Sequence, residues 1–256
     1  MSVEVHRGPR PSRAAGALVV ARREVAGALD AGIAFVVAAG FALLASTAFM
    51  NEFFLAGRLD MSPWFERLPY LYLLFLPAIS MRLWAEERRA RTFEVLLAFP
   101  LTPAQLVAGK FLAALALLAL VLSSSLPIVA LLCALGEPDP GLIAGGYLAA
   151  FLSGALLLAV GLVVSCLSKD QVTAFVLTAV ASAALVLVGH ERVVAVLDGL
   201  APGLRAGSAL ARHVALLPHA QALGRGLIEL DALVYFAGGT LACLWINARL
   251  VARLRD

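Results

Sequence analysis

Charged residues are scarce in this chain: Asp, Glu, Lys and Arg make up 14% of its 256 residues, whereas hydrophobic residues make up 62%. The middles of the long apolar runs contain no charged residue and no histidine. Because most apolar residues fall in uninterrupted runs long enough to cross a bilayer, a soluble domain is excluded. Proton- and ion-coupled transporters usually bury ionisable groups along their path, so secondary transport is also disfavoured.

The motifs of nucleotide and hydrolytic sites are missing as well. Gly109-Lys110 resembles the end of a P-loop, but Ala104 replaces its first glycine and Phe111 replaces its Ser or Thr. Neither a His-Glu-x-x-His zinc motif nor a Gly-x-Ser-x-Gly nucleophile elbow occurs. We therefore expect no catalytic residue and no cofactor on this chain, with any ATP and Mg bound by a separate subunit.

Metal and nucleic-acid sites have little support. The three cysteines lie within or at the ends of apolar runs, where a thiol usually serves as a small hydrophobic side chain. His213 and His219 share one loop, but their spacing and the intervening Pro218 fit no standard ligand pattern. The arginines flank apolar runs and form no stripe with aromatic residues, so the basic pI of about 9.0 is better explained by membrane topology than by nucleic acid.

Six apolar runs have the length and composition of transmembrane helices. They cover residues 31–50, 68–83, 111–135, 142–167, 172–188 and 232–248. We predict an all-α polytopic membrane protein with one six-helix domain over residues 31–250. An amino-terminal segment, residues 1–30, would carry an interfacial amphipathic helix at 17–29, and a short tail would cover residues 251–256. A signal peptide is the rival interpretation of the first run, which is however long and follows an extended basic lead.

The distribution of basic residues predicts the topology. Fourteen of the 20 Lys and Arg residues lie before the first run, at 82–110, at Lys169 or after the last run, and six lie in the other three loops. By the positive-inside rule, both termini and the 82–110 segment face the cytoplasm. Residues 189–231 then form a long periplasmic loop, with enough apolar residues for short helices at the outer membrane face.

The densest run of charge, at 82–110, has the pattern of two helices. Residues 83–97 have the period of an amphipathic helix, and Pro100 ends it. Its polar side would carry the i,i+4 pair Glu87 and Arg91 together with Glu94, and its apolar side Leu83, Ala90, Phe93 and Leu97. Thr102-Pro103-Ala104-Gln105 predicts the capping box of a second helix, which continues into the third apolar run. We expect these two helices to form a bent elbow, and we expect movement of the elbow to be transmitted to the third membrane helix.

Three further patterns concern the membrane helices. Ser168-Lys169-Asp170-Gln171 predicts another capping box, in a very short loop before the fifth run. Gly146, Ala150 and Gly154 recur at every fourth position, which lets another helix approach closely. Ser123-Ser124-Ser125 and Pro127 could open the third helix locally or bond a neighbouring helix, and helix packing is favoured. Trp64, Tyr70 and Tyr72 suit a membrane interface.

At the elbow the sequence resembles a known family. Glu86-Glu87-Arg88-Arg89-Ala90-Arg91-Thr92-Phe93-Glu94-Val95-Leu96-Leu97, followed by Pro100-Leu101-Thr102 and Gly109-Lys110-Phe111, resembles ABC-transporter permeases of the type-2 exporter class. The likeness is greatest to the gliding-motility and nitrous-oxide-reductase-maturation branch. The stretches 168–175 and 224–231, with Tyr235-Phe236 after the latter, resemble the same branch. Arg91 stands where this family usually has glycine.

The resemblance implies a six-helix permease in a bacterial inner membrane, whose elbow is the coupling helix for a separate cytoplasmic ABC ATPase. The implied ATPase-coupling residues are Glu86, Glu87, Arg88, Arg91, Thr92, Glu94 and Leu97, with a second cytoplasmic contact at Ser168, Lys169, Asp170 and Gln171. A second permease chain, identical or homologous, would complete the assembly. Three alternatives stay open: a mechanical transmission unit acting on a periplasmic partner at 189–231, an elbow resting on anionic headgroups, and a membrane-embedded enzyme.

Overall fold

The computed structural model describes residues 13–56, 61–93, 96, 99–200, 206–226 and 229–255, and the elements in this part of the chain are all helical. They are α1 (Arg13–Asp30), α2 (Ile33–Ala56), α3 (Ser62–Ser80), α4 (Arg82–Arg89), α6 (Pro103–Ser123), α7 (Leu126–Leu135), α8 (Pro140–Leu167), α9 (Gln171–Leu187), α10 (Glu191–Leu200), α11 (Ala206–His213), α12 (Leu216–Gly224) and α13 (Leu230–Arg255). Five spans are long and apolar enough to cross a membrane, or up to six if the bent pair α9 and α10 counts as one. The predicted all-α polytopic fold is confirmed.

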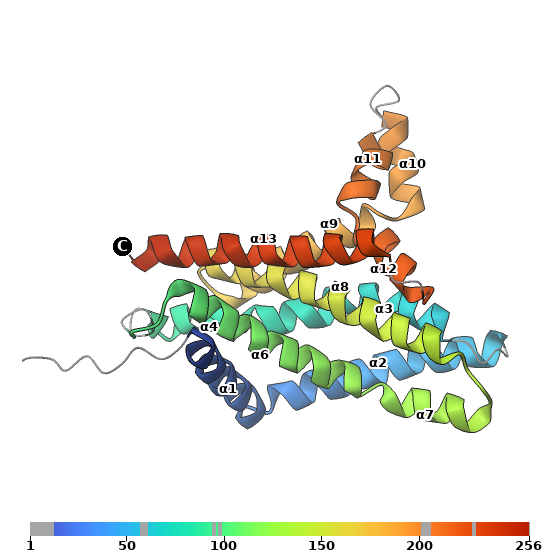
Figure 1. Ribbon diagram of the computed structural model, residues 1–256, viewed down its shortest axis with the longest axis horizontal. Helices are drawn as coiled ribbons and strands as arrows, with labels where there is room; N and C mark the ends of the chain where they lie inside the picture. The colour runs from blue at the N-terminus through green and yellow to red at the C-terminus, as the bar shows by residue number, and fades with distance from the viewer. Residues whose placement is uncertain are drawn as a thin grey trace, which may run out of the picture.

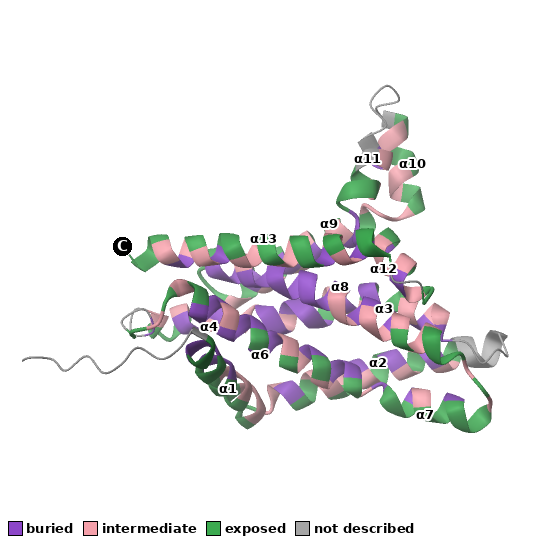
Figure 2. Cartoon of the chain, in the orientation of Figure 1, coloured by how far each residue is buried: buried purple, intermediate pink, exposed green. Residues whose placement is uncertain are grey.

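The membrane helices form a bundle around α8. Figure 1 shows α2, α3, α6, α8 and α13 running along the long axis of the molecule, and α8 contacts α3, α6, α9 and α13. Figure 2 shows the buried residues gathered on α8 and the helices beside it, whereas α13 exposes much of its surface. The amino-terminal helix α1, the short helix α4 and the end of α13 lie at one end of this bundle, and α7 and α12 lie at the other (Figure 1).

Small residues allow α8 to occupy the centre. A Cβ atom on Gly146 would overlap the ring of Phe65 from α3, and one on Gly154 would lie 2.7 Å from Leu118 Cδ2 of α6. Backbones that approach this closely gain van der Waals contact, which is a main source of helix association in lipid. The predicted close approach of another helix at the glycine stripe is thus found within the chain itself.

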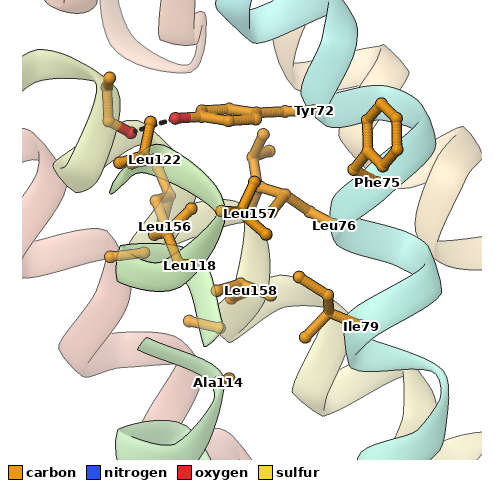
Figure 3. Close-up of a cluster of buried hydrophobic side chains, with 14 of the residues drawn as sticks. Tyr72, Phe75, Leu76, Ile79, Ala114, Leu118, Leu122, Leu156, Leu157 and Leu158 are labelled. Carbon is orange, nitrogen blue, oxygen red and sulfur yellow. Dashed lines mark hydrogen bonds between the residues drawn. The ribbon is translucent and has the colours of Figure 1, made fainter. Parts of the chain in front are cut away.

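Leucines of α8 fill the space between α3 and α6. Figure 3 shows Leu157 and Leu158 between Leu76 and Ile79 on one side and Leu118 on the other, and both α8 leucines are fully buried. Tyr72, also buried, donates a hydrogen bond from its hydroxyl to the Ala150 carbonyl oxygen at 3.0 Å. An apolar core with one satisfied polar group therefore fixes α3 against α8.

Two of the three aromatic residues that suit a membrane interface are buried in the core of the bundle. Trp64 is 2% exposed and lies edge-on to Phe65, with ring centroids 5.0 Å apart, and Tyr72 bonds α8. Tyr70 is exposed. Trp64 and Tyr72 are buried because α3 begins at Ser62, earlier than the apolar run, and packs on α8.

The third span is interrupted at its serines. α6 ends at Ser123 and α7 begins at Leu126, where Pro127 lacks the N–H that a continuous helix would use. The serine hydroxyls donate to carbonyl oxygens three residues earlier, and Ser125 Oγ also lies 2.7 Å from the Tyr147 hydroxyl of α8. The serine cluster therefore both opens the helix and bonds a neighbour.

The segment after α9 folds into three short helices, as expected for residues 189–231. α10 is bent by 82° from α9, and it pairs with α11 in a hairpin that stands out from the bundle near α12 (Figure 1). Asp198 holds this hairpin together, because its carboxylate accepts hydrogen bonds from the backbone N–H and the hydroxyl of Ser208. The third helix, α12, returns to the bundle and packs on α8 and α13.

Candidate functional site at the elbow

The first elbow helix is shorter than predicted. α4 ends at Arg89, and Arg91 has a φ of 55°, in the left-handed region. A residue in this conformation interrupts an α-helix, so residues 83–97 do not form one continuous helix. Glycine adopts the left-handed region without steric cost, which accounts for its usual presence here in the family that the elbow resembles.

Ser165 of α8 joins the start of α4 to the end of α3. Its hydroxyl oxygen accepts hydrogen bonds from the backbone N–H groups of Trp84 and Ala85, both at 3.2 Å, and the hydroxyl donates to the Met81 carbonyl oxygen at 3.2 Å. Met81, the residue before α4, provides no side-chain cap. A side chain from another helix thus provides hydrogen-bond acceptance for backbone N–H groups at the start of α4, which have no carbonyl partner within the helix.

A fully buried lysine connects the elbow to two other helices. Lys110 of α6 is 0% exposed, and its Nζ lies 2.9 Å from Glu24 Oε1 of α1 and 3.0 Å from Glu87 Oε1 of α4. The same ammonium lies 4.8 Å from the ring centroid of Trp84, which is also 0% exposed. We call these four residues the Lys110 cluster. A buried cation needs such partners, because taking it out of water is costly.

The Lys110 cluster corrects the assignment of Glu87. This residue was predicted on the polar docking side of the elbow, paired with Arg91, but it is 9% exposed and faces Lys110. The i,i+4 ion pair of α4 joins Arg82 to Glu86 instead, through two hydrogen bonds of 2.7 and 2.8 Å. Glu87 is therefore unsuited to direct contact with an ATPase.

The exposed part of the elbow is basic. Arg89, Arg91 and Thr92 are exposed, and Arg88 and Glu86 are partly buried. The Arg88 guanidinium lies 5.1 Å from the ring centroid of Phe93, which in turn lies edge-on to Trp84 at 5.8 Å. Of the other predicted coupling residues, Glu94 and Leu97 lie outside the residues that the structure describes. We call Arg89, Arg91 and Thr92 the elbow patch.

The second predicted contact, Ser168 to Gln171, lies at the junction of α8 and α9, both of which contact α4. The predicted capping box, in which Ser168 would be the N-cap, is not formed. The N-cap of α9 is Asp170, whose carboxylate accepts hydrogen bonds from the backbone N–H and the hydroxyl of Thr173, both at 2.8 Å. Both bonds lower the pKa of Asp170 below its usual value, and the bond from the backbone N–H has the larger effect. Ser168 is buried and donates to Val164, so Lys169 and Asp170 are the exposed residues here.

The second elbow helix begins as predicted. Thr102 caps α6, with its Oγ1 accepting from the Gln105 N–H at 3.3 Å and its own N–H donating to Gln105 Oε1 at 2.8 Å. Arg255, near the end of α13, donates to the neighbouring Leu101 carbonyl oxygen at 2.9 Å. The capping box fixes the start of α6, and the end of α13 is hydrogen-bonded to the residue just before this cap.

Replacing Ser165 with alanine should loosen the elbow. The change leaves the buried N–H groups of Trp84 and Ala85 without their partner, which costs about 1–3 kcal/mol for an unsatisfied buried group. We expect a lower thermal unfolding midpoint for the purified protein in detergent. Ser123→Ala is the matched control, since this exposed hydroxyl bonds only the Leu120 carbonyl of its own helix. Equal midpoints for the two variants would contradict the role of Ser165.

The chain resembles a known protein family over about half of its length. A family model described as ABC-2 family transporter protein matches residues 68–192. No curated protein matches the chain. The matched residues run from α3 to the start of α10 and include the elbow patch, Lys110, Ser165 and the α8–α9 junction.

Proposed function

We propose that the chain is the membrane subunit of an ATP-driven exporter, because a family model of ABC-2 transporters matches residues 68–192. We further place it in the gliding-motility and nitrous-oxide-reductase-maturation branch of type-2 exporters. ATP and Mg are bound by a separate cytoplasmic ABC ATPase, and two permease chains, identical or homologous, assemble with two ATPase chains. This chain carries no cofactor and performs no hydrolysis.

The Lys110 cluster carries the coupling proposal. It joins α4, which ends at Arg89 of the elbow patch, to α1 and α6, while Ser165 joins α4 to α3 and α8. A displacement of the elbow patch would therefore move several membrane helices together, since buried polar networks and packed cores resist gradual deformation. The ATPase supplies this displacement when it closes on nucleotide.

Charge at the elbow patch favours an acidic groove on the ATPase. Arg89 and Arg91 are exposed, and the exposed Lys169 lies at the α8–α9 junction beside α4. Complementary charge across an interface speeds association and fixes register. The same arginines would also suit anionic lipid headgroups, so recruitment of the ATPase has to be measured directly.

The coupling test is charge reversal within the elbow patch. Arg89→Glu should reduce copurification of the ATPase that assembles on the wild-type chain, and should lower coupled ATP hydrolysis by about tenfold, the effect expected when a favourable charge contact becomes repulsive. Both are measured at matched membrane levels. Arg192→Glu, an exposed position on α10, is the control and should behave as wild type. ATP hydrolysis by the isolated wild-type chain would exclude the permease assignment altogether.

The proposed topology predicts a labelling pattern. Both termini and the elbow face the cytoplasm of a bacterial inner membrane, as the basic residues indicate. Single cysteines at the exposed positions Ala90 and Lys169, in a cysteine-free background, should be shielded from an impermeant thiol reagent in intact cells. Cysteines at Asp139 and Arg212 should react. Labelling of position 90 from outside would reverse the topology and remove the coupling assignment.

The α10–α11 hairpin supports a second candidate function, the mechanical transmission of ATPase motion to a periplasmic partner. Hydrophobic residues on the described parts of this hairpin face outward, with Val196 62% and Leu210 41% exposed. A chain that binds a partner here would retain ATPase recruitment after deletion of residues 191–213 but lose the partner. Solute transport that persists in the deletion variant would favour the exporter.

A further inference from the structure

A cavity of about 390 Å³ opens between α1, α2, α3, α4 and α6, beside the Lys110 cluster. Its volume lies within the roughly 300–1,000 Å³ that is typical of ligand sites. One part of its wall is apolar, with Val37 of α2 and Leu117 and Val121 of α6. The other part carries charged residues of α1 and α4. The cavity therefore matches a ligand with an apolar body and a polar end.

One of the carboxylates at the charged wall has an oxygen atom without a hydrogen-bond partner. Glu87 lines the cavity and uses Oε1 for Lys110, whereas its Oε2 is buried and has no hydrogen-bond partner within the described part of the chain. A buried carboxylate oxygen without a donor is costly. A ligand group that donates a hydrogen bond to Oε2 would remove this cost.

The neighbouring charges indicate what the ligand should carry. Arg82 is bonded through two nitrogens to Glu86, and Lys110 is shared by Glu24 and Glu87. A positively charged N–H donor would thus best satisfy Glu87 Oε2, because an ammonium makes stronger bonds to carboxylates than a neutral donor. Arg23, exposed on α1, lines the same cavity and provides a cation for an adjacent phosphate.

The corner between α1 and α2 leaves room for such a ligand. Gly27 lines the cavity, and a Cβ atom there would have no atom within 4 Å. The small side chains of Ala28, Ala31 and Ala34 line the cavity beside it. A turn at Gly32, with a φ of 71°, separates the two helices and sets their spacing. The corner therefore has room beside Gly27 for part of an acyl chain.

We propose that this cavity binds a phospholipid of the bilayer with a primary-amine headgroup, of the phosphatidylethanolamine type. Its ammonium donates to Glu87 Oε2, its phosphate faces Arg23, and an acyl chain lies along the apolar wall of α2 and α6. A choline headgroup has the same charge but no N–H to donate, and a glycerol headgroup lacks the cation. The bound lipid would fasten α1 to the elbow, whether or not the chain exports a solute.

The test compares lipids that differ only in their headgroup. The purified full-length chain is exchanged into detergent with dioleoyl phosphatidylethanolamine, phosphatidylcholine or phosphatidylglycerol, and retained lipid is counted by native mass spectrometry. We expect about tenfold greater retention of phosphatidylethanolamine, the size expected for one hydrogen bond to a charged group. Equal retention of the ethanolamine and choline lipids, or a preference for phosphatidylglycerol, would overturn the proposal.

Two variants locate the bound lipid. Gly27→Leu fills the cavity and should abolish the preference for the ethanolamine lipid. Gly238→Leu on α13 is its matched control, because both glycines are exposed and a Cβ on either meets no atom within 4 Å, but Gly238 does not line the cavity. Glu87→Gln should remove the headgroup preference while lipid is still retained. An unchanged preference in the Gly27 variant would place the lipid elsewhere and overturn this site.

Discussion

Replacing Lys110 with methionine should destabilise the protein by about 3–5 kcal/mol, the usual cost of removing one partner from a buried ion pair. Lys110 is fully buried between Glu24 and Glu87, so the variant leaves two carboxylates facing each other without a cation. Methionine has nearly the same length as lysine and keeps the packing against Trp84. We expect a marked fall in the thermal unfolding midpoint in detergent and release of α1 from α6, visible as protease cleavage within residues 13–30.

Two controls separate charge from packing in this experiment. The triple variant Glu24→Gln, Glu87→Gln, Lys110→Met should recover most of the lost stability, because neutral replacements of a whole buried ion network are often tolerated. Lys169→Met at the exposed α8–α9 junction should change stability by at most about 0.5 kcal/mol, as is usual for surface changes. A triple variant as unstable as the single one would show that the two unpaired carboxylates do not cause the loss of stability.

Gly161→Leu should have the second large effect. A Cβ atom at this position of α8 would overlap the side chain of Ser80 in α3 and lie 3.0 Å from Thr178 Cγ2 in α9. Overpacking usually costs about 1–3 kcal/mol, and a leucine between three helices should exceed this range because none of them can move alone. We expect little monodisperse protein by fluorescence-detected size exclusion.

The Gly161 prediction is tested by making the same substitution at a glycine that has free space around it. Gly238→Leu, where the added side chain meets open space, should elute like the wild type. If the Gly161 variant also eluted normally with an unchanged unfolding midpoint, α3, α8 and α9 would have to be less tightly packed at their crossing than the structure indicates. Gly161→Ala should fall between the two leucine variants.

The membrane helices and the Thr102 cap could be predicted from sequence because both depend on nearby residues. A run of apolar residues determines a span by itself, and a capping box involves residues three positions apart. The same local reasoning was wrong for the helix at 83–97. The spacing of apolar residues does not indicate that Arg91 has a left-handed backbone conformation, which interrupts the helix. At the α8–α9 junction, Ser168 and Asp170 are both residue types that can serve as an N-cap, and Asp170 is the N-cap of α9 in the structure.

Long-range contacts account for the remaining errors at the site. Glu87 was predicted to be exposed because its helix has a polar side, yet its partner Lys110 comes from the following helix and Glu24 from a much earlier one. No local pattern indicates that the hydroxyl of Ser165 meets the start of α4 about 80 residues earlier. The one usable signal was Lys110 itself, a lone charge at the start of an apolar run, which needs buried partners or a path to the surface.

The 82° bend after α9 has a consequence for the surrounding lipid. α9 has 17 residues, which span about 26 Å at 1.5 Å per residue, whereas the hydrocarbon core of a typical bilayer is about 30 Å thick. Its neighbour α8 has 28 residues and spans about 42 Å. Hydrophobic mismatch on the α9 side would thin the adjacent leaflets, at a cost of fractions of a kcal/mol per Å. The bilayer should therefore be thinner beside α9 than beside α8.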